Sequence, residues 1–307
     1  MLKSATSPSR KPLAANLIQH HLIPKPFENM YINRKCFIAT ILVSLIVLLF
    51  INPLKAQRKD AFVDIGSIIS LKLYMLKDKD TLGIGTGFVM RKEGIPYLIT
   101  NLHNLTGVDY WTGKYFDSLK RQPNNIIIEH HLLNKLGNWI SKKQSLYTGE
   151  IKNWNEVFAD GKIMDVVSLK LTDTSNISIY DINIDNGDAP YRIIPGSHFF
   201  VIGYPFGMTA SKQYPVWKTV FLASEYADNY LDIPVFLIDG TTRKGMSGSP
   251  VIMKGNYTVI ERTSGKEIPI SVLGYSLKGI YSGHIDALEL SAVFKTEVIE
   301  SLLKSSK

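Results

Sequence analysis

The sequence has a single cysteine, Cys36, among its 307 residues. Residues 57–307 can therefore form no internal disulfide, and no cysteine-rich zinc site can be built from them. The seven histidines include no His-Glu-x-x-His pair, so we expect no bound metal and no other cofactor. This stretch of about 250 residues must be stabilised by a packed core, and it is long enough to bury one.

Most of the chain also lacks an excess of charge of either sign. The formal net charge is +8 at pH 7, but residues 1–56 contain seven Lys and Arg residues beside one acid, Glu28. Residues 57–307 carry 28 basic and 26 acidic residues. Since a nucleic-acid-binding domain needs a clustered basic surface, this balance predicts no nucleic-acid partner.

Only one long apolar run occurs, and it lies near the N-terminus. Residues 1–29 are polar, and we expect them to be disordered, or untranslated if translation begins at Met30. Residues 30–56 begin with a short basic lead, continue through the uncharged run Cys36–Ile51 and end at Ala56, as a secretory signal peptide does. The run has 16 residues, whereas a spanning helix needs about 20. We expect cleavage after Ala56 and a periplasmic or secreted protein; the alternative is an uncleaved anchor, which would be the protein's only contact with a membrane.

Residues 57–307 are predicted to form one domain of short β-strands separated by turns. The strand-like runs are Ser67–Leu76, Leu82–Met90, Ile95–Thr100, Asn125–His131, Ile163–Leu171, His198–Gly203, Val216–Ser224, Val235–Asp239, Val251–Met253 and Ile270–Tyr281. A single helix is expected within Leu290–Leu303, where Phe294, Val298 and Leu302 recur every four residues. This pattern predicts an all-β barrel or sandwich. Two polar segments, Thr106–Gln122 and Gly207–Tyr214, are expected to be rim loops.

A glycine-bracketed turn, Gly245-Met246-Ser247-Gly248, precedes an apolar strand that starts at Pro250. Glycine lets a backbone bend sharply and approach a ligand closely. A serine on such a turn can act as a nucleophile, with neighbouring N–H groups facing a developing oxyanion. The alternatives are an ordinary turn or the nucleophile elbow of α/β-hydrolases, but the elbow requires a following helix and here a strand follows.

A catalytic serine also needs a base and a carboxylate. His103 follows one predicted strand, Asp165 begins another, and Ser247 comes last. The order His, Asp, Ser is that of the chymotrypsin template and differs from those of subtilisin and the α/β-hydrolases. The other residues that could serve are Asp160, Asp109, Asp117, His284 and Asp286.

Several blocks in order resemble the bacterial trypsin-like serine proteases. Gly85-Thr-Gly-Phe-Val and Tyr97-Leu-Ile-Thr-Asn-Leu-His103 are similar to the family's region around its catalytic histidine. Asp165-Val-Val-Ser-Leu-Lys-Leu is similar to its aspartate strand, and Gly245-Met-Ser-Gly-Ser-Pro-Val to its serine block. Two further similar segments are Phe200–Pro205 and Gly279–Gly283. The resemblance extends from about Ile65 to the C-terminus and implies a single protease domain without an appended peptide-binding module.

The resemblance implies a chymotrypsin-type double β-barrel of six strands each, with a cleft between the barrels and a C-terminal helix. In that fold His103 would be the general base and acid, Asp165 would orient it, and Ser247 would attack the scissile carbonyl. The N–H groups of Gly245 and Ser247 would form the oxyanion hole.

The family's substrate-binding positions can be transferred in the same way. Thr241 or Thr242 would lie near the base of the first specificity pocket. Ser282 and Gly283 would align the backbone of a polypeptide substrate as an added strand.

The sequence departs from the family pattern at several positions. Met246 stands where the family usually has Asp or Asn, and Asn101-Leu102 replaces small residues before His103. Ser249 and Thr242 are similar to residues of glutamyl endopeptidases, but Tyr281 stands where those enzymes typically have histidine, which argues against acidic specificity. We expect an exported serine endopeptidase. The alternative, motivated by Met246, is a non-catalytic binding module with the same fold, possibly membrane-anchored.

Overall fold

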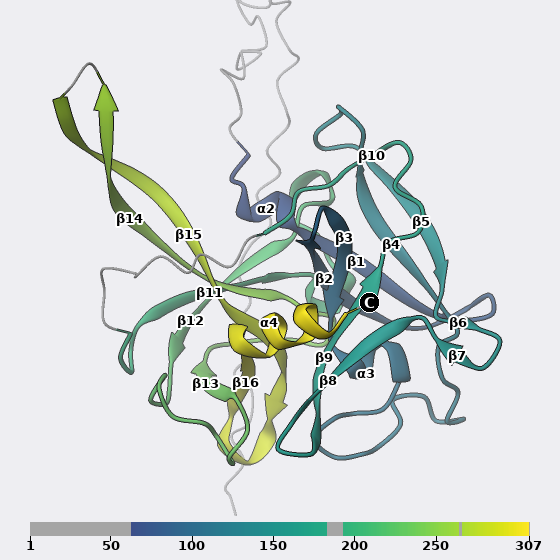
Figure 1. The fold of residues 1–307 in the computed structure, drawn as a ribbon. Coiled ribbons are helices and arrows are strands. Elements are labelled where there is room, and N and C mark those ends of the chain that lie inside the picture. Colours follow the sequence, from purple (N-terminus) through teal and green to yellow (C-terminus); the bar gives the residue numbers. More distant parts are fainter. Residues whose placement is uncertain (1–62, 183–192, 264–265, 307) are drawn as a thin grey trace, which may run out of the picture. The chain divides into compact units, whose positions relative to one another are not determined.

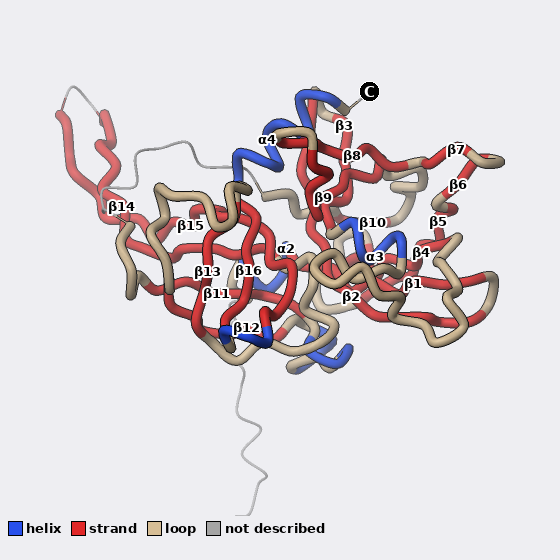
Figure 2. The backbone as a smooth tube through the Cα atoms, turned by 90° about the horizontal axis from the view of Figure 1, so that it is seen from below, coloured by secondary structure: helices blue, strands red, loops and turns tan. Residues whose placement is uncertain are grey.

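The computed structural model describes residues 63–182, 193–263 and 266–306. Two groups of antiparallel strands make up this part of the chain (Figures 1 and 2). The expected signal region 30–56 lies outside the described residues. No helix of the described ranges is long and apolar enough to cross a membrane.

The first group is an eight-stranded sheet with the order β10-β4-β1-β2-β3-β9-β8, in which β5 also pairs with β4. Its strands are β1 (Ser70–Lys77), β2 (Asp80–Lys92), β3 (Ile95–Thr100), β4 (Asn125–Leu132), β5 (Trp139–Ser145), β8 (Trp154–Ala159), β9 (Lys162–Lys170) and β10 (Ile177–Ser178). A separate two-stranded sheet joins β6 (Tyr147–Thr148) to β7 (Ile151–Lys152). Leu73, Leu98, Ile128 and Val167 belong to the core of the large sheet.

The second group is a closed six-stranded barrel with the order β11-β12-β13-β16-β15-β14. Its strands are β11 (His198–Gly203), β12 (Val216–Leu222), β13 (Val235–Asp239), β14 (Pro250–Thr263), β15 (Lys266–Ile285) and β16 (Leu290–Lys295). Phe199, Phe236 and Val293 are fully buried in its interior. The long strands β14 and β15 continue past the barrel as a hairpin (Figure 1).

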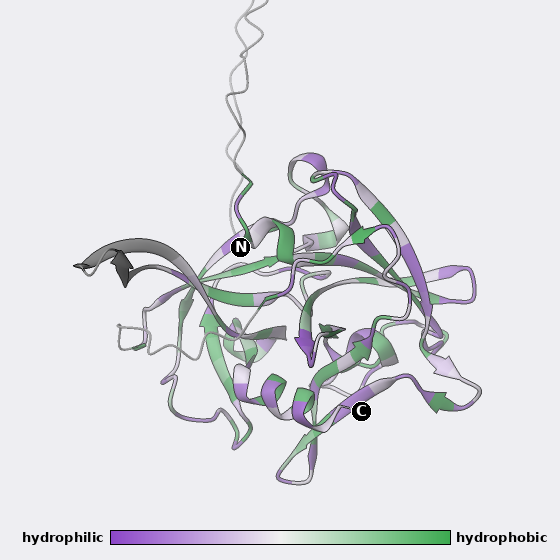
Figure 3. Ribbon diagram, turned by 45° about the horizontal axis from the view of Figure 1, so that its top comes forward, coloured by the Kyte–Doolittle hydropathy of each residue, from purple (hydrophilic) through white to green (hydrophobic). Residues whose placement is uncertain are grey.

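Short helices lie beside the strands. They are α2 (Gly66–Ile69), α3 (Leu102–Thr106), α4 (Thr296–Ser305) and the 3-10 turns η1 (Pro205–Gly207), η2 (Ser211–Gln213) and η3 (Asp286–Leu288). Helix α4 follows the last barrel strand but packs against β8 and β9 of the other sheet. Its apolar face of Val298, Ile299 and Leu302 is buried in a core cluster shared by both strand groups. Figure 3 shows apolar segments on this helix and on the strands beside it.

The all-β fold class and the C-terminal helix are confirmed, and most expected strands lie within a few residues of the observed ones. Several boundaries were wrong: the strand expected at Val251–Met253 continues to Thr263, and two further errors change the type of an element. The run Ser67–Leu76 begins with α2 before β1, and Leu290–Lys295 is strand β16, so the helix begins only at Thr296. Val293 packs into the barrel core while its neighbours Ala292 and Phe294 pack into the shared core. A strand buried on both faces reads as a continuous apolar run, which imitates helical spacing.

Two adjacent histidines of β4, His130 and His131, are buried, each about 1% exposed. Burial lowers the pKa of each to about 4 from 6.5, because burial penalises the imidazolium form. His131 Nε2 lies 3.0 Å from the Ile68 carbonyl oxygen. A neutral ring with its proton on Nε2 can donate a hydrogen bond to that oxygen.

We expect acid to destabilise the fold through these residues. In the unfolded chain these two histidines take up protons near pH 6.5, and in the folded chain only near pH 4. The stability that depends on their being neutral is therefore fully present above pH 6.5 and is lost as the pH drops toward 4. Between pH 7 and 5 the unfolding free energy should decrease by about 1–2 kcal/mol for each histidine. Urea unfolding across this range, beside His130→Leu, measures the effect. An unchanged pH slope in the variant would contradict it.

Candidate active site

His103 lies on helix α3, directly after strand β3, and Asp165 lies on β9, the strand paired with β3. Strand β3 ends at Thr100, and α3 follows at once. The Asn101 side-chain N–H donates to the backbone oxygen of Asp165 at 2.6 Å. The junction between β3 and α3 is therefore tied to the strand that carries the aspartate.

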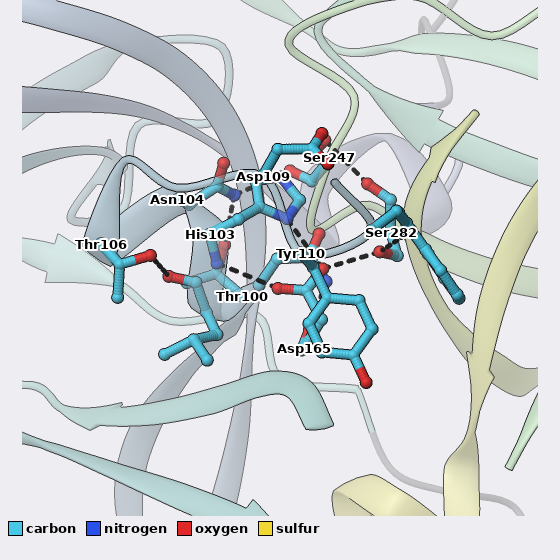
Figure 4. A network of polar contacts seen from close by, with 12 residues as sticks. Thr100, His103, Asn104, Thr106, Asp109, Tyr110, Asp165, Ser247 and Ser282 are labelled. Carbon is cyan, nitrogen blue, oxygen red and sulfur yellow. Dashed lines mark hydrogen bonds and ion pairs between the residues drawn. The ribbon is translucent and has the colours of Figure 1, made fainter. Parts of the chain in front are cut away.

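The carboxylate of Asp165 is fully buried and receives several hydrogen bonds. The backbone N–H of His103 donates to Oδ1 at 2.9 Å, and His103 Nδ1 lies 2.7 Å from Oδ2. The Ser282 hydroxyl donates to the same Oδ2 at 2.6 Å. Burying a carboxylate costs free energy unless it is hydrogen-bonded, and these hydrogen bonds offset that cost. Figure 4 shows this network.

Ser247 and Ser282 connect the barrel to this carboxylate. The Ser247 hydroxyl donates to the backbone oxygen of Ser282 at 2.9 Å. The Trp111 indole N–H donates to the Ser282 hydroxyl oxygen at 3.3 Å. Ser282 thus contacts the serine turn through its backbone and Asp165 through its side chain.

The serine turn requires glycine at two positions. Gly245 has φ 92° and Gly248 has φ 87°, which lie in the region that side-chain-bearing residues avoid. A Cβ on Gly245 would collide with the Tyr204 backbone oxygen, and one on Gly248 with that of Thr86. The turn is therefore packed directly on the backbones of both strand groups.

The peptide unit between Lys244 and Gly245 has a fixed orientation. The Lys244 carbonyl accepts a hydrogen bond from the Phe206 N–H at 2.6 Å. In a trans peptide the C=O and N–H point in opposite directions. The N–H of Gly245 consequently points away from Phe206.

The peptide unit between Met246 and Ser247 is held in the same manner. The Met246 carbonyl accepts from the Ser249 N–H at 2.9 Å, so the Ser247 N–H points the other way. Within the described part of the chain, the N–H groups of Gly245 and Ser247 have no acceptor. Two free donors on a rigid turn are suited to binding a negative oxygen.

Thr86 of β2 and Asn104 of α3 also bind the serine turn. The Thr86 hydroxyl donates to the Gly245 carbonyl at 2.8 Å, and the Thr86 N–H donates to the Ser247 carbonyl at 2.9 Å. The Asn104 amide N–H, buried beside His103, also donates to the Ser247 carbonyl at 3.1 Å. The carbonyl groups of the serine turn are thus bound by the segments that lead to the histidine.

Met246, the departure from the family pattern, lies in the barrel core with no exposed surface. It packs in a cluster with Phe199, Val251 and Tyr281. The side chain before Ser247 is therefore held by apolar packing, where a carboxylate would need a buried partner.

The two threonines expected near the specificity pocket differ in exposure. Thr241 is exposed, whereas Thr242 is buried and accepts a hydrogen bond from the Tyr281 hydroxyl at 2.8 Å. The Ser291 hydroxyl lies 3.0 Å from that of Thr242. Burial raises the pKa of Tyr281, which keeps the phenol neutral. These three side chains form a cluster of uncharged hydroxyls.

The expected rim loop after α3 lies beside the network. A bridge between Val108 and Tyr115 makes it a small hairpin, and the Phe116 ring contacts the His103 ring edge-on with centroids 5.6 Å apart. Trp111 lies beside Gly283, where an added Cβ would be 3.8 Å from the indole. Burial, and next the charge of Asp165, raise the pKa of Tyr110 to about 12, so its hydroxyl remains a donor to the Ile163 carbonyl.

The competing acids and histidine have other partners or positions, although Asp109 lies close to the network (Figure 4). Asp109 binds Thr112 within the rim loop, and Asp117 forms an ion pair with Arg121. His284 and Asp286 face each other at 3.9 Å on the surface, and Asp160 is in the turn between β8 and β9. Across residues 63–182, 193–263 and 266–306, no group of three or more His, Cys, Asp or Glu could hold a metal ion.

The sequence reasoning missed Thr86, Asn104 and Phe206 as contacts of the serine turn. Thr86 and Asn104 lie within or next to the two blocks that resemble the family's histidine region, and that position was the available signal. Phe206 directly follows the similar segment Phe200–Pro205, but its contribution is made by a backbone N–H in an unusual conformation, which its residue type does not signal.

A profile of the trypsin-like peptidase domain matches residues 85–259. Solved structures with a similar fold include the serine endoprotease from Yersinia pestis, with 15% identity, a TM-score of 0.46, and coverage of 80% of this chain and 69% of that one. The tobacco vein mottling virus protease has 12% identity, a TM-score of 0.45 and coverages of 80% and 87%. The scabies mite inactivated protease paralogue S-I1 has 14% identity, a TM-score of 0.45 and coverages of 80% and 98%. A search of curated protein sequences finds no match.

The contact between Asn104 and Ser247 leads to a stability prediction. Asn104→Asp replaces a donor to the Ser247 carbonyl and the Thr100 hydroxyl with a buried acceptor. We expect the unfolding free energy at pH 7 to fall by about 2–4 kcal/mol, since the new group is charged and unpaired. The loss should shrink toward pH 4 as the carboxyl group takes up a proton. Denaturant unfolding measures it.

Asn138→Asp, at an exposed asparagine, is the matched control and should change stability by less than about 0.5 kcal/mol. If both variants lost equally little stability, the hydrogen bond from Asn104 to the Ser247 carbonyl would contribute little to the free energy of unfolding.

Proposed function

Because the chain belongs to the trypsin-like peptidase domain family, we propose that it is an exported serine endopeptidase that cleaves polypeptides through an acyl-enzyme. The observation that carries the proposal is the buried 2.7 Å contact between His103 Nδ1 and Asp165, linked through Ser282 to Ser247. The family provides the reaction type. The linked contacts support His103 as the base, Asp165 as its partner and Ser247 as the nucleophile.

In the proposed reaction His103 is the base. With Nδ1–H donating to Asp165, the neutral imidazole carries an acceptor lone pair on Nε2. Nε2 takes the proton of the Ser247 hydroxyl as Oγ attacks the scissile carbonyl, and later gives it to the leaving amine. Asp165 stabilises the imidazolium in between, and the Ser282 hydroxyl supports the carboxylate from the barrel side.

Ser247 begins this cycle with its hydroxyl donating to the Ser282 carbonyl. Attack requires the side chain to rotate so that the proton faces His103. Substrate that occupies the Ser282 carbonyl as an added strand would favour the rotation, because it removes the competing acceptor.

The oxyanion of the tetrahedral intermediate is proposed to bind the N–H groups of Gly245 and Ser247. Their peptide units are oriented by the Phe206 and Ser249 N–H groups before any substrate arrives. Donors that need no reorganisation contribute most to such electrostatic stabilisation. Thr242 is proposed at the base of the first specificity pocket, with Thr241 at its edge and the backbone of Ser282 and Gly283 beside the substrate.

The activated serine can be tested by labelling the purified protein with a fluorophosphonate. We expect labelling of the wild type, none of Ser247→Ala, and a loss on the order of 10³-fold or more in the labelling rate of His103→Ala and Asp165→Asn. Ser141→Ala, at an exposed serine of β5, is the matched control and should label as the wild type does.

A folded wild type that does not react would favour the non-catalytic binding module. Labelling that persists in Ser247→Ala would place the reactive group elsewhere in the chain. Either result would overturn the assignment of these three residues.

Export is the second part of the proposal, and it rests on residues 30–56 alone. We expect the exported protein to begin at Gln57, since the small side chain of Ala56 suits a signal peptidase site. N-terminal sequencing and the intact mass of the exported protein measure this, and Ala56→Arg should retain the longer form. A wild-type protein that keeps residues before Gln57 would instead support the membrane anchor.

A further inference from the structure

A hollow of about 370 Å³ lies beside the serine turn, on the side of the first sheet. Its walls include Leu82 and Ile84 of β2, the ring of Phe206, and Lys244 with Gly245 of the turn. The walls are largely apolar, none of the lining residues is acidic, and Lys244 is exposed at the edge.

Phe206 is an unusual residue for this place. Its side chain is 58% exposed, and its backbone has φ 52° and ψ 24°, a left-handed conformation that is an outlier for a bulky residue. Strained residues persist where the surroundings hold them, and they cluster at functional sites. Here the hydrogen bond to the Lys244 carbonyl holds the backbone, and an exposed aromatic ring remains next to the turn.

The hollow is built from rigid parts. Gly207, with φ 72°, packs so closely on Ile84 that an added Cβ would lie 2.8 Å from its Cδ1. The Phe206 backbone is bound to the turn, and the Thr86 hydroxyl binds the Gly245 carbonyl. A ligand therefore meets a preformed surface, which lowers the cost of binding.

Gly245 belongs both to this hollow and to the proposed oxyanion hole. A peptide whose scissile carbonyl reaches the Gly245 N–H must continue past the turn in both directions. Ser282 and Gly283 follow Tyr281, which binds Thr242 of the proposed first specificity pocket, so they are assigned to the acyl side of the cleaved bond; neither residue lines the hollow. The remaining direction is that of the leaving group.

We propose that the hollow binds a large apolar side chain at one of the first two substrate positions after the cleaved bond, with a preference for an adjacent acidic side chain near Lys244. This rests on the proposed function and specifies the substrate class of the same site. Apolar area buried against Leu82, Ile84 and Phe206 supplies the affinity. The Lys244 ammonium supplies a charge preference that salt should weaken.

The test begins with a peptide library digested by the full purified protein, with cleavage sites read by mass spectrometry. We expect Leu, Ile, Met or Phe, and Asp or Glu, to be enriched just after the cut. Two peptides that differ only in Leu or Gly at the enriched position should then differ on the order of tenfold in kcat/KM, since one apolar contact contributes that much discrimination.

Phe206→Ala should reduce that ratio to about twofold, since most of the apolar wall is lost. Lys244→Glu should reverse the preference between Glu and Lys beside the apolar residue. Phe158→Ala, at an aromatic residue of β8 that is 61% exposed, is the matched control and should keep the ratio. The two variants act on different contacts, so misfolding of one leaves the other as a test.

Failure of this inference is distinguishable from failure of the proposed function. A wild type that neither reacts with a fluorophosphonate nor cleaves peptides overturns both. A wild type that cleaves but shows no preference after the cut, or whose ratio is unchanged in Phe206→Ala, overturns the inference alone. A preference confined to residues before the cut would do the same.

Discussion

The buried carboxylate of Asp165 is the constraint on which the site depends. A carboxylate with no exposed surface must be paired or hydrogen-bonded, and donors from both strand groups meet at its two oxygens. His103 reaches it from the helix that follows β3, and Ser282 reaches it from β15. Since neither strand group alone provides all the donors, the network is complete only when the two groups are docked.

The serine turn shows the same dependence on both groups. Its carbonyl oxygens are bound by Thr86 and Asn104 from one side and by Phe206 from the other. The carbonyls of Lys244 and Met246, which accept from the N–H groups of Phe206 and Ser249, share peptide units with the N–H groups of Gly245 and Ser247 and leave those N–H groups facing the opposite way. The geometry that could bind an oxyanion is thus a consequence of how the opposite ends of the same peptide units are satisfied.

Apolar packing replaces cross-links and charge throughout the region. Residues 57–307 have no cysteine, and the side chain before Ser247 is the fully buried Met246. Helix α4 follows the barrel yet packs its apolar face on β8 and β9. Burial of these side chains is the main favourable contribution to docking the two groups. The polar network is placed by this core and stabilises the site only once water is excluded.

The sequence alone was sufficient to predict the all-β class, most strands and the C-terminal helix, because alternation of apolar residues and turn chemistry are local properties. It also singled out His103, Asp165 and Ser247 as a set through their order and family resemblance. Only the tertiary structure decided which carboxylate meets His103, where Leu290–Lys295 pairs, and which groups bind the serine turn. Thr86 and Gly245 are 159 residues apart, and Ser282 and Asp165 are 117 apart. Contacts over such distances depend on barrel closure and on the docking of two cores, which no local pattern encodes.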